Sequence, residues 1–270
     1  MKADLHLHTS ASDGTWTPEE LTENLINAGI GVFAVTDHDS VENVNLTADL
    51  VKNTDLRFMK GVEVNTTENG YLFHILGYNI DPENLSLKEV LSVNRNTMNG
   101  RDERSIRILK EMGYPVSPDE YRAYVNDPAR GGWKALSYAV DKGLCQNHKD
   151  FFRLFKENRS QVTIDGCVKP ERAISAIKAA GGIPVLAHPG ADLYGKSPAT
   201  IVSMAIERGV EGVECFHPEN DDETTQYCLA LCRREKLYIT GGSDCHGTFV
   251  KERRLGKPDI DLDQLSLWDF

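Results

Sequence analysis

The chain has 270 residues, 40% of them hydrophobic, which is enough for one sizeable core, and its 41 acidic and 30 basic side chains give a formal charge of −11. This negative charge disfavours attraction to phosphate polymers, so stable binding of long nucleic acid is not expected. The sequence has no leader-like start and no run of about 18 apolar residues, so we expect a cytoplasmic protein without membrane association.

Short β-rich runs alternate with amphipathic helices in the first part of the chain. Strands are predicted at residues 3–8, 31–36 and 56–64, followed by a hairpin-like stretch at 71–80. The helix after the first strand has the clearest start. Thr17 and Glu20 form a capping box there, Pro18 suits the first turn, and Gly29 ends the helix.

From residue 85 to residue 168 the sequence is charged and helical, with almost no strand signal. Helices are predicted there at 93–112, 118–125, 133–142 and 149–157. Alternation then resumes, with strands at 183–187, 210–216 and 237–240 and helices at 170–180, from 197 and at 222–235. We therefore expect residues 1–84 and 169–270 to form a mainly parallel α/β sheet or barrel, interrupted by a helical insertion at 85–168.

Almost every histidine follows a predicted strand. Seven of the eight lie at strand ends or in the hairpin, and only His148 does not. With the neighbouring acids, this set comprises His6, His8, Asp37, His38, Glu63, His74, His188, His217, Asp244 and His246. Because the carboxyl ends of parallel strands converge on one face, we expect these side chains to meet there.

The spacing of the first pair indicates metal binding. His6 and His8 alternate with Leu5 and Leu7, so the two imidazoles share one side of a strand, roughly 6 to 7 Å apart, and can reach one cation. Ligands of imidazole and carboxylate without thiolate suit Mn, Zn or Fe, and several carboxylates favour Mn. A single histidine at a strand end is more often structural, but the whole set needs common partners, which metal ions supply.

Five motif regions match a known family. They are residues 4–9 (DLHLHT) with 12–14 (SDG), 36–39 (TDHD), 61–64 (GVEV), 187–190 (AHPG) and 243–246 (SDCH). On these motifs the chain resembles, over nearly its whole length, the PHP (polymerase and histidinol phosphatase) superfamily of metal-dependent phosphoesterases, in its TrpH-like branch. The resemblance implies a distorted (β/α)7 barrel of PHP type with a small helical insertion domain covering the active site.

The same resemblance implies two or three divalent metal ions, with Mn expected ahead of Fe or Zn. One ion would take His6, His8, Glu63 and Asp244, a second would share Glu63 and take His74 and His188, and a third would take Asp13, His38 and His246. Asp37 is expected to orient a ligand. His217 is expected to contact phosphate or protonate the leaving group, and Asp244 could also accept a proton.

Substrate contacts are expected from Arg130 and Lys134, because in this family the insertion covers the metal site. Most Lys and Arg side chains on helices are simply solvated, so a structural interpretation of both residues stays open. Nucleotide-cleaving relatives usually show Arg-Pro-His at this point, whereas this chain has Arg-Gly-Gly-Trp at 130–133. This departure leaves the substrate open.

The resemblance implies an enzyme, a metal-dependent phosphoric ester hydrolase. Its expected substrate is a small phosphorylated metabolite or nucleotide, such as a nucleoside 3',5'-bisphosphate or a short oligonucleotide 5' end, attacked at phosphorus by metal-bound hydroxide. The alternative is a cyclic phosphodiesterase acting on a sugar cyclic phosphate. A non-catalytic PHP module and an amide hydrolase are weaker alternatives, since the ligand set is complete and no lysine at a strand end is a candidate for carbamylation.

Overall fold

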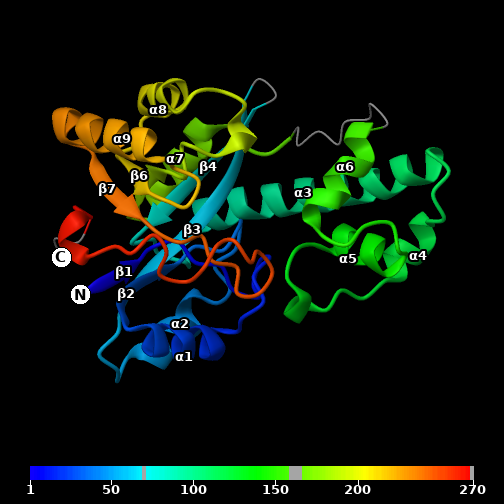
Figure 1. The fold of residues 1–270 in the computed structure, drawn as a ribbon, viewed down its shortest axis with the longest axis horizontal. Coiled ribbons are helices and arrows are strands. Elements are labelled where there is room, and N and C mark those ends of the chain that lie inside the picture. The colour runs from blue at the N-terminus through cyan, green and yellow to red at the C-terminus, as the bar shows by residue number, and fades with distance from the viewer. Residues whose placement is uncertain (69–70, 158–165, 268–270) are drawn as a thin grey trace.

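The structure, a computed structural model, describes residues 1–68, 71–157 and 166–267. In these residues seven strands form one sheet whose order follows the chain (Figure 1). They are β1 (Lys2–Asp4), β2 (Ile30–Val35), β3 (Arg57–Glu68), β4 (Tyr71–Tyr78), β5 (Ile183–Leu186), β6 (Gly212–Phe216) and β7 (Tyr238–Gly241). Only β4 runs antiparallel to its neighbours, so the sheet is mainly parallel, as predicted.

The two edges of this sheet lie against each other. Beyond β1, the Leu5 N–H donates to the Gly241 carbonyl over 3.1 Å, and the His8 N–H donates to the Cys245 carbonyl over 3.0 Å. Leu7 and Cys245 also form a parallel bridge. Because β1 pairs with β2 while the segment after β1 pairs with the end of β7 and the residues beyond it, the sheet curls into a distorted barrel, which confirms the predicted fold class.

Five helices of the described residues cover the outside of the barrel (Figure 1). They are α1 (Pro18–Ala28), α2 (Val44–Val51), α7 (Pro170–Ala179), α8 (Pro198–Glu207) and α9 (Asp222–Glu235). α1 begins with the predicted capping box between Thr17 and Glu20 and ends at Gly29, whose φ of 69° is the left-handed conformation that glycine adopts without strain. α2 was not predicted.

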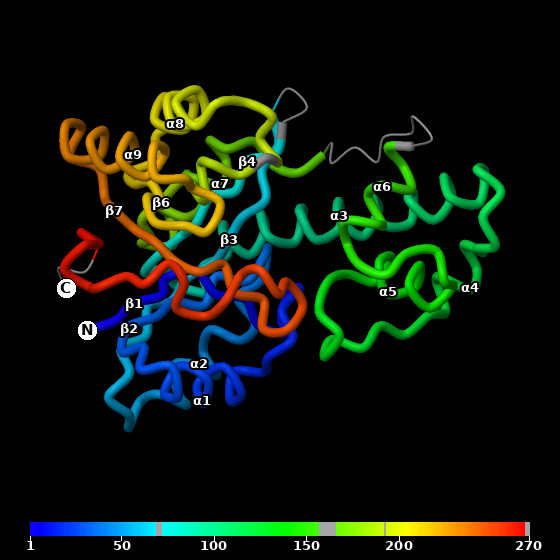
Figure 2. Tube along the Cα trace, viewed as in Figure 1, coloured from blue at the N-terminus to red at the C-terminus, as the bar shows by residue number. Residues whose placement is uncertain are grey.

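Helices α3 to α6 project to one side of the barrel (Figure 2). They are α3 (Leu85–Glu111), α4 (Pro118–Ala123), α5 (Lys134–Asp141) and α6 (His148–Glu157). α3 begins at Leu85 rather than at residue 93, because the Asn84 side chain accepts from the Leu87 N–H over 3.1 Å and caps the helix. Residues 158–165 of the predicted insertion lie outside the described residues. Neither α3 nor any other described helix is long and apolar enough to cross a membrane.

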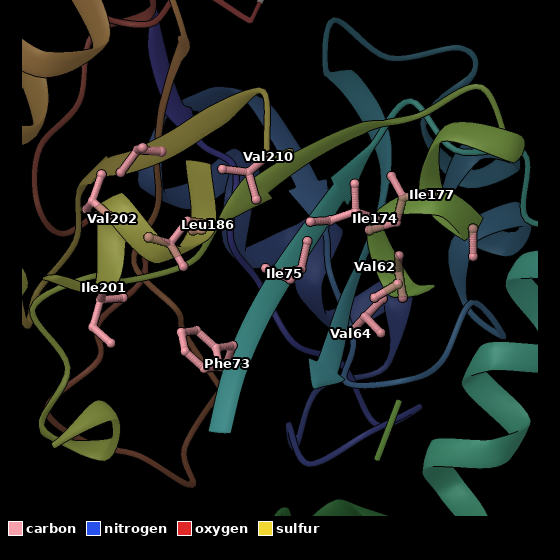
Figure 3. Close-up of a cluster of buried hydrophobic side chains, with 14 of the residues drawn as sticks. Val62, Val64, Phe73, Ile75, Ile174, Ile177, Leu186, Ile201, Val202 and Val210 are labelled. Atoms are coloured by element: carbon pink, nitrogen blue, oxygen red, sulfur yellow. The ribbon is translucent and has the colours of Figure 1, made fainter. Parts of the chain in front are cut away.

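The largest buried apolar cluster joins the middle strands to α7 and α8 (Figure 3). Its labelled members are Val62, Val64, Phe73, Ile75, Ile174, Ile177, Leu186, Ile201, Val202 and Val210. On α3, Leu87 and Leu91 belong to this core, whereas Ile106 and Leu109 belong to a second, smaller core among α3, α5 and α6. One long helix therefore connects two separate hydrophobic cores. Short 3-10 helices at Pro128–Arg130, Asp192–Tyr194 and Leu262–Gln264 complete the described elements.

Candidate metal centre

His6 and His8 lie just beyond β1, with their imidazoles facing the same region. Both side chains are fully buried, and their ring centroids are 5.2 Å apart. Leu5 and Leu7, which alternate with them, are instead members of two apolar clusters. The alternation of strand side chains therefore places both imidazoles on one side, as the spacing predicts.

Glu63 lies at the centre of the histidines, and its two carboxylate oxygens face different rings. Oε2 lies 3.0 Å from His6 Nε2 and 3.2 Å from His8 Nε2. Oε1 lies 2.8 Å from His74 Nδ1 and 3.0 Å from His188 Nε2. A carboxylate divided in this way has the geometry to bridge two cations.

The positions of Glu63 and His74 along their strands differ from expectation. Glu63 lies inside β3 rather than at its end, because β3 continues to Glu68 in antiparallel pairing with β4. β4 runs in the opposite direction, so its first half, which carries His74, reaches the same end of the barrel as the carboxyl ends of the other strands. Both side chains reach the cluster by this extended hairpin.

Asp244 and Asp13 supply further carboxylates. Asp244 Oδ1 lies 2.9 Å from His8 Nε2, and Asp13 Oδ1 lies 3.3 Å from His246 Nε2. The ring centroid of His8 lies 4.0 Å from that of His246 and 4.7 Å from that of His38. The structure thus brings together every residue predicted as a metal ligand: His6, His8, Asp13, His38, Glu63, His74, His188, Asp244 and His246.

The donor atoms in this cluster suit divalent cations. They include the groups His6–His8–Glu63–Asp244, His38–Glu63–His74 and His8–Asp13–His38–His246, each with ligand atoms within 4.8 Å of one another. His8 Nε2 and Asp244 Oδ1 lie 2.9 Å apart, yet in the described structure neither atom has a hydrogen-bond partner, and both are buried. Because unpaired buried polar atoms are costly, a cation between the two would satisfy both.

The protonation of the cluster also fits cation binding. Burial opposes the charge on Glu63, but His38 and His6 hold the pKa of this carboxyl well below its usual range. Burial likewise opposes the charge on His8, but the neighbouring carboxylates of Asp244 and Glu63 raise the pKa of this imidazole to about 10. Burial lowers the pKa of His38 to about 3. Cation binding must therefore displace a proton from His8, whereas His38 is already neutral at pH 7.

Three residues on the loops of this face have left-handed backbone conformations. Asp39, His188 and Asp244 have φ values of 46°, 26° and 51°. Such conformations cost on the order of 1–3 kcal/mol each for residues other than glycine. Two of these residues are predicted ligands, so the backbone is held in a costly conformation where their side chains are aimed at the cluster.

Glu214, within β6, was missed by the sequence prediction. Its side chain is fully buried, its Oε1 accepts from His6 Nδ1 over 2.9 Å, and its Oε2 accepts from the His188 N–H over 2.8 Å. It therefore orients two predicted ligands, and with His6 and His217 it forms a fourth group able to hold a metal. The available signal was a carboxylate within the otherwise apolar run at 212–216.

Asp37 acts on the loop beside the cluster. Its carboxylate accepts from the Thr9 N–H over 2.8 Å, from the Thr9 hydroxyl over 2.6 Å and from the Ser12 hydroxyl over 2.6 Å. Ser12 precedes Asp13 and lies 3.5 Å from His8 Nδ1. Asp37 thus orients the segment that carries two ligands, in the supporting role expected for it.

His217 and Arg253 meet at the edge of the cluster. His217 Nε2 lies 3.3 Å from Asp244 Oδ2, and its Nδ1 accepts from the Glu219 N–H over 3.0 Å. Arg253, which the sequence prediction also missed, contacts the same Asp244 oxygen and pairs with Glu219 over 3.0 Å. Its only sequence signal was its place in the charged run at 251–254, and such runs are usually solvated.

Arg130 and Lys134 are not directed at the cluster. Arg130 pairs with Asp141 over 2.9 Å and donates to the Tyr124 hydroxyl over 3.0 Å. The Lys134 ammonium donates to the Arg122 carbonyl over 3.2 Å. Both side chains bond within the insertion, and the predicted substrate contacts stay predictions.

The chain is similar in sequence to several proteins of known activity. The chain is 28% identical over 248 residues to the 5'-3' exoribonuclease Rnm of Escherichia coli, covering 90% of this chain and 84% of that protein. It is 26% identical to the phosphoribosyl 1,2-cyclic phosphate 1,2-diphosphodiesterase of Eggerthella lenta, covering 95% and 98%. It is also 26% identical to the 3',5'-nucleoside bisphosphate phosphatase of Chromobacterium violaceum, covering 94% and 90%.

A solved structure from Bifidobacterium adolescentis, assigned as a metal-dependent phosphoesterase, superposes with a TM-score of 0.82 at 26% identity, covering 97% of this chain and 93% of that one. All these proteins are described as hydrolases of phosphate esters, which confirms the class of enzyme predicted from the sequence. The PHP domain model matches residues 4–160, which is more than half of the 270 residues. With the ligand motifs gathered on one face of the barrel, this chain belongs to the PHP domain family.

Proposed function

We propose that this protein hydrolyses small phosphate esters at a centre of two or three divalent cations, with manganese the expected metal. The observation that carries the proposal is the buried pair of His8 Nε2 and Asp244 Oδ1, which lie 2.9 Å apart without hydrogen-bond partners in the described structure, among all the other predicted ligands. Such a set of imidazoles and carboxylates is typical of catalytic metal sites.

The proposed ligand sets follow the division of donor atoms around Glu63. One cation takes His6, His8, Glu63 and Asp244; a second shares Glu63 and takes His74 and His188; and a third takes Asp13, His38 and His246. Support for the bridge comes from Glu63 itself, whose Oε2 faces His6 and His8 while its Oε1 faces His74 and His188.

When bound, the cations would lower the pKa of a water towards about 7 and neutralise charge on the phosphoryl group. The role of His217 follows from its tautomer. Because its Nδ1 accepts from the Glu219 N–H, the proton of the neutral ring lies on Nε2, beside Asp244. This supports donation of a hydrogen bond to a phosphate or leaving-group oxygen, and the carboxylate of Asp244 is the proposed proton acceptor.

Residues 85–168 are proposed as an insertion that covers the metal centre, with 1–84 and 169–270 as the barrel. Support comes from contacts between the insertion and the loops that carry ligands. The Gly132 N–H donates to the Asp13 carbonyl over 2.8 Å, and Lys149 pairs with Glu252, six residues after His246, over 3.0 Å. Substrate would then lie between the metals and the insertion, where Arg130 and Lys134 are the proposed contacts.

The proposed substrate is a small phosphorylated metabolite or nucleotide, such as a nucleoside 3',5'-bisphosphate or a short oligonucleotide 5' end. The bisphosphate phosphatase and exoribonuclease relatives support this class. The alternative is a sugar cyclic phosphate, supported by the cyclic phosphodiesterase relative, which matches the chain nearly end to end. The formal charge of −11 supports small substrates over long nucleic acid.

The test is turnover of these three substrate types by the full chain reconstituted with manganese. We expect cleavage of a nucleoside 3',5'-bisphosphate or of a short 5'-phosphorylated oligonucleotide, and preference for a ribose 1,2-cyclic phosphate would favour the alternative. Failure to cleave any phosphate ester would reject the proposed function. For the substrate contact, Arg130→Ala should raise KM about tenfold, whereas the exposed Arg122→Ala should not change it.

A further inference from the structure

Arg253 lies on the loop that follows β7, and this loop contacts the helical insertion through the pair of Lys149 and Glu252. One guanidinium nitrogen, Nη1, contacts Asp244 Oδ2, and the other, Nη2, donates to Glu219 Oε2 over 3.0 Å. Its side chain is 21% exposed, so this arginine is not sealed inside the protein. Among the ion pairs of the described residues, this is the one in which an Arg or Lys side chain contacts a proposed metal ligand.

The two carboxylate oxygens of Asp244 have different partners. Oδ1 faces His8 Nε2 at 2.9 Å, whereas Oδ2 is shared by Arg253 and by His217 Nε2. Two hydrogen-bond donors from different loops therefore converge on one oxygen at the rim of the cluster. A phosphoryl oxygen bound beside this carboxylate oxygen would be within reach of the same two donors.

The charge balance at this rim changes when the cluster holds cations. Arg253 is always charged, and without metal it is neutralised by Asp244 and Glu219. Cations bound to Asp244 would compete for its negative charge and place further positive charge beside the guanidinium. A further anion would help to restore the balance, and the anion that this enzyme class brings to its metals is the phosphate of the substrate.

We propose that Arg253 binds the phosphoryl group under attack, donating to one of its non-bridging oxygens beside His217, and that Glu219 holds the guanidinium in place. The proposal rests on the proposed function and deepens it by assigning a catalytic arginine. A planar guanidinium can donate to Glu219 with Nη2 and to phosphate with its remaining N–H groups, whereas a lysine has a single charged centre. A lysine at position 253 should therefore bind phosphate more weakly than the arginine does.

Inorganic phosphate is the probe, because its binding to the manganese-loaded full chain can be measured by calorimetry without turnover. Arg253→Met should weaken phosphate binding by about tenfold to a hundredfold, and Arg253→Lys by less. The matched control is Arg254→Met, which removes an adjacent but exposed arginine and should stay within about twofold of the wild type. Manganese content after dialysis should be equal in all four proteins.

Phosphate affinity unchanged in both Arg253 variants would overturn the proposal, as would wild-type protein that binds no phosphate. Loss of manganese from Arg253→Met with phosphate affinity per bound metal unchanged would also overturn it, because the residue would then only balance the charge of Asp244. Since the readout is binding, a wild type that binds phosphate but cleaves no ester counts against the proposed function alone. Glu219→Gln should weaken phosphate binding by a smaller factor than Arg253→Met.

Discussion

The face of the barrel that carries the proposed metal ligands, here called the metal face, differs from the helical insertion in how its buried charged groups are paired. In the described structure His8 Nε2 and Asp244 Oδ1 are buried there without hydrogen-bond partners, whereas the buried carboxylate of Asp102 in the insertion has hydrogen-bond partners within the protein. Asp102 accepts from the Ala135 N–H over 3.2 Å and from the Tyr121 hydroxyl over 3.5 Å. Charged groups at the metal face thus need a ligand to complete them, while those of the insertion hold together a small core. The two regions should respond differently to the loss of a single charge.

The largest effect is expected from Glu63→Ala, which removes the carboxylate shared by two proposed cations. We expect kcat/KM to fall by at least about a thousandfold, because several kcal/mol of transition-state stabilisation depend on those cations. Glu103→Ala is the matched change in the insertion, since Glu103 pairs with the exposed Arg107, and it should stay within about twofold of the wild type. Steady-state kinetics with manganese measure both variants. A Glu63→Ala enzyme as active as the wild type would show that the proposed bridging carboxylate is not needed for catalysis.

A change at the junction of the two regions should affect stability rather than chemistry. The side-chain amide nitrogen of Asn94, on α3, donates to Asp39 Oδ1 over 2.7 Å and to the backbone carbonyl of Asn65 over 2.6 Å. Its side-chain oxygen accepts from the Val168 N–H over 2.9 Å. It therefore ties both ends of the insertion to the barrel. Asn94→Ala should lower the free energy of unfolding by about 3 kcal/mol, since it leaves buried partners unpaired.

Denaturant unfolding of the metal-free protein measures this loss. Asn96→Ala, at an exposed site on the same helix, is the control and should change the free energy of unfolding by less than about 0.5 kcal/mol. Equal stability of the two variants would show that Asn94 does not fix the junction.

Glu214→Gln tests whether the orientation of His6 and His188 by Glu214 contributes to metal binding. The amide cannot accept from both His6 Nδ1 and the His188 N–H with the strength of a carboxylate, so manganese should bind about 10- to 100-fold more weakly. Glu211→Gln, just before the same strand and paired with Lys178, is the control and should bind manganese like the wild type. Equal affinities of the two variants in a manganese titration would exclude the orienting role of Glu214.

The smallest effect is expected in the insertion, and it depends on pH. Burial raises the pKa of Asp102 from 3.8 to about 6. The folded state therefore holds this proton more tightly than the unfolded state, so the contribution of Asp102 to stability falls as the pH rises from about 4 to 6. Asp102→Asn should remove that penalty and stabilise the protein by about 1–2 kcal/mol at pH 8, less than the full pKa shift implies because Arg101 loses a counter-charge.

Thermal unfolding at pH 8 and pH 4.5 measures this dependence, and the gain should shrink at the lower pH. A gain of the same size at both pH values would contradict a buried, proton-binding carboxyl at residue 102.

Local patterns were sufficient to predict much of the barrel and which side chains gather on one face of it. The alternation of His6 and His8 with leucines fixes which side they face, and the capping box at Thr17 fixes the start of α1. α2 was missed because Asn43 makes no side-chain capping bond and no motif marks its start. α3 was predicted to begin too late, although Asn84 caps it and Leu87, Val90 and Leu91 follow at helical spacing.

Residues whose role depends on tertiary contact were the ones missed. Glu214 is placed by pairing of β6 with β5 and β7, and its partner His6 lies more than 200 positions away in sequence. Arg253 reaches Asp244 and Glu219 only because the loop after β7 folds back over the metal face. No spacing rule within one strand or helix reports such contacts.

Metal content is the most direct test of the central claim, that these side chains meet in order to hold divalent cations. Untagged wild-type protein and Glu63→Ala, both incubated with manganese and dialysed, would be measured by mass spectrometry of the metals. We predict two or three manganese ions per wild-type chain and fewer in Glu63→Ala. A wild-type chain that retains no cation, or as many as the variant, would contradict the account.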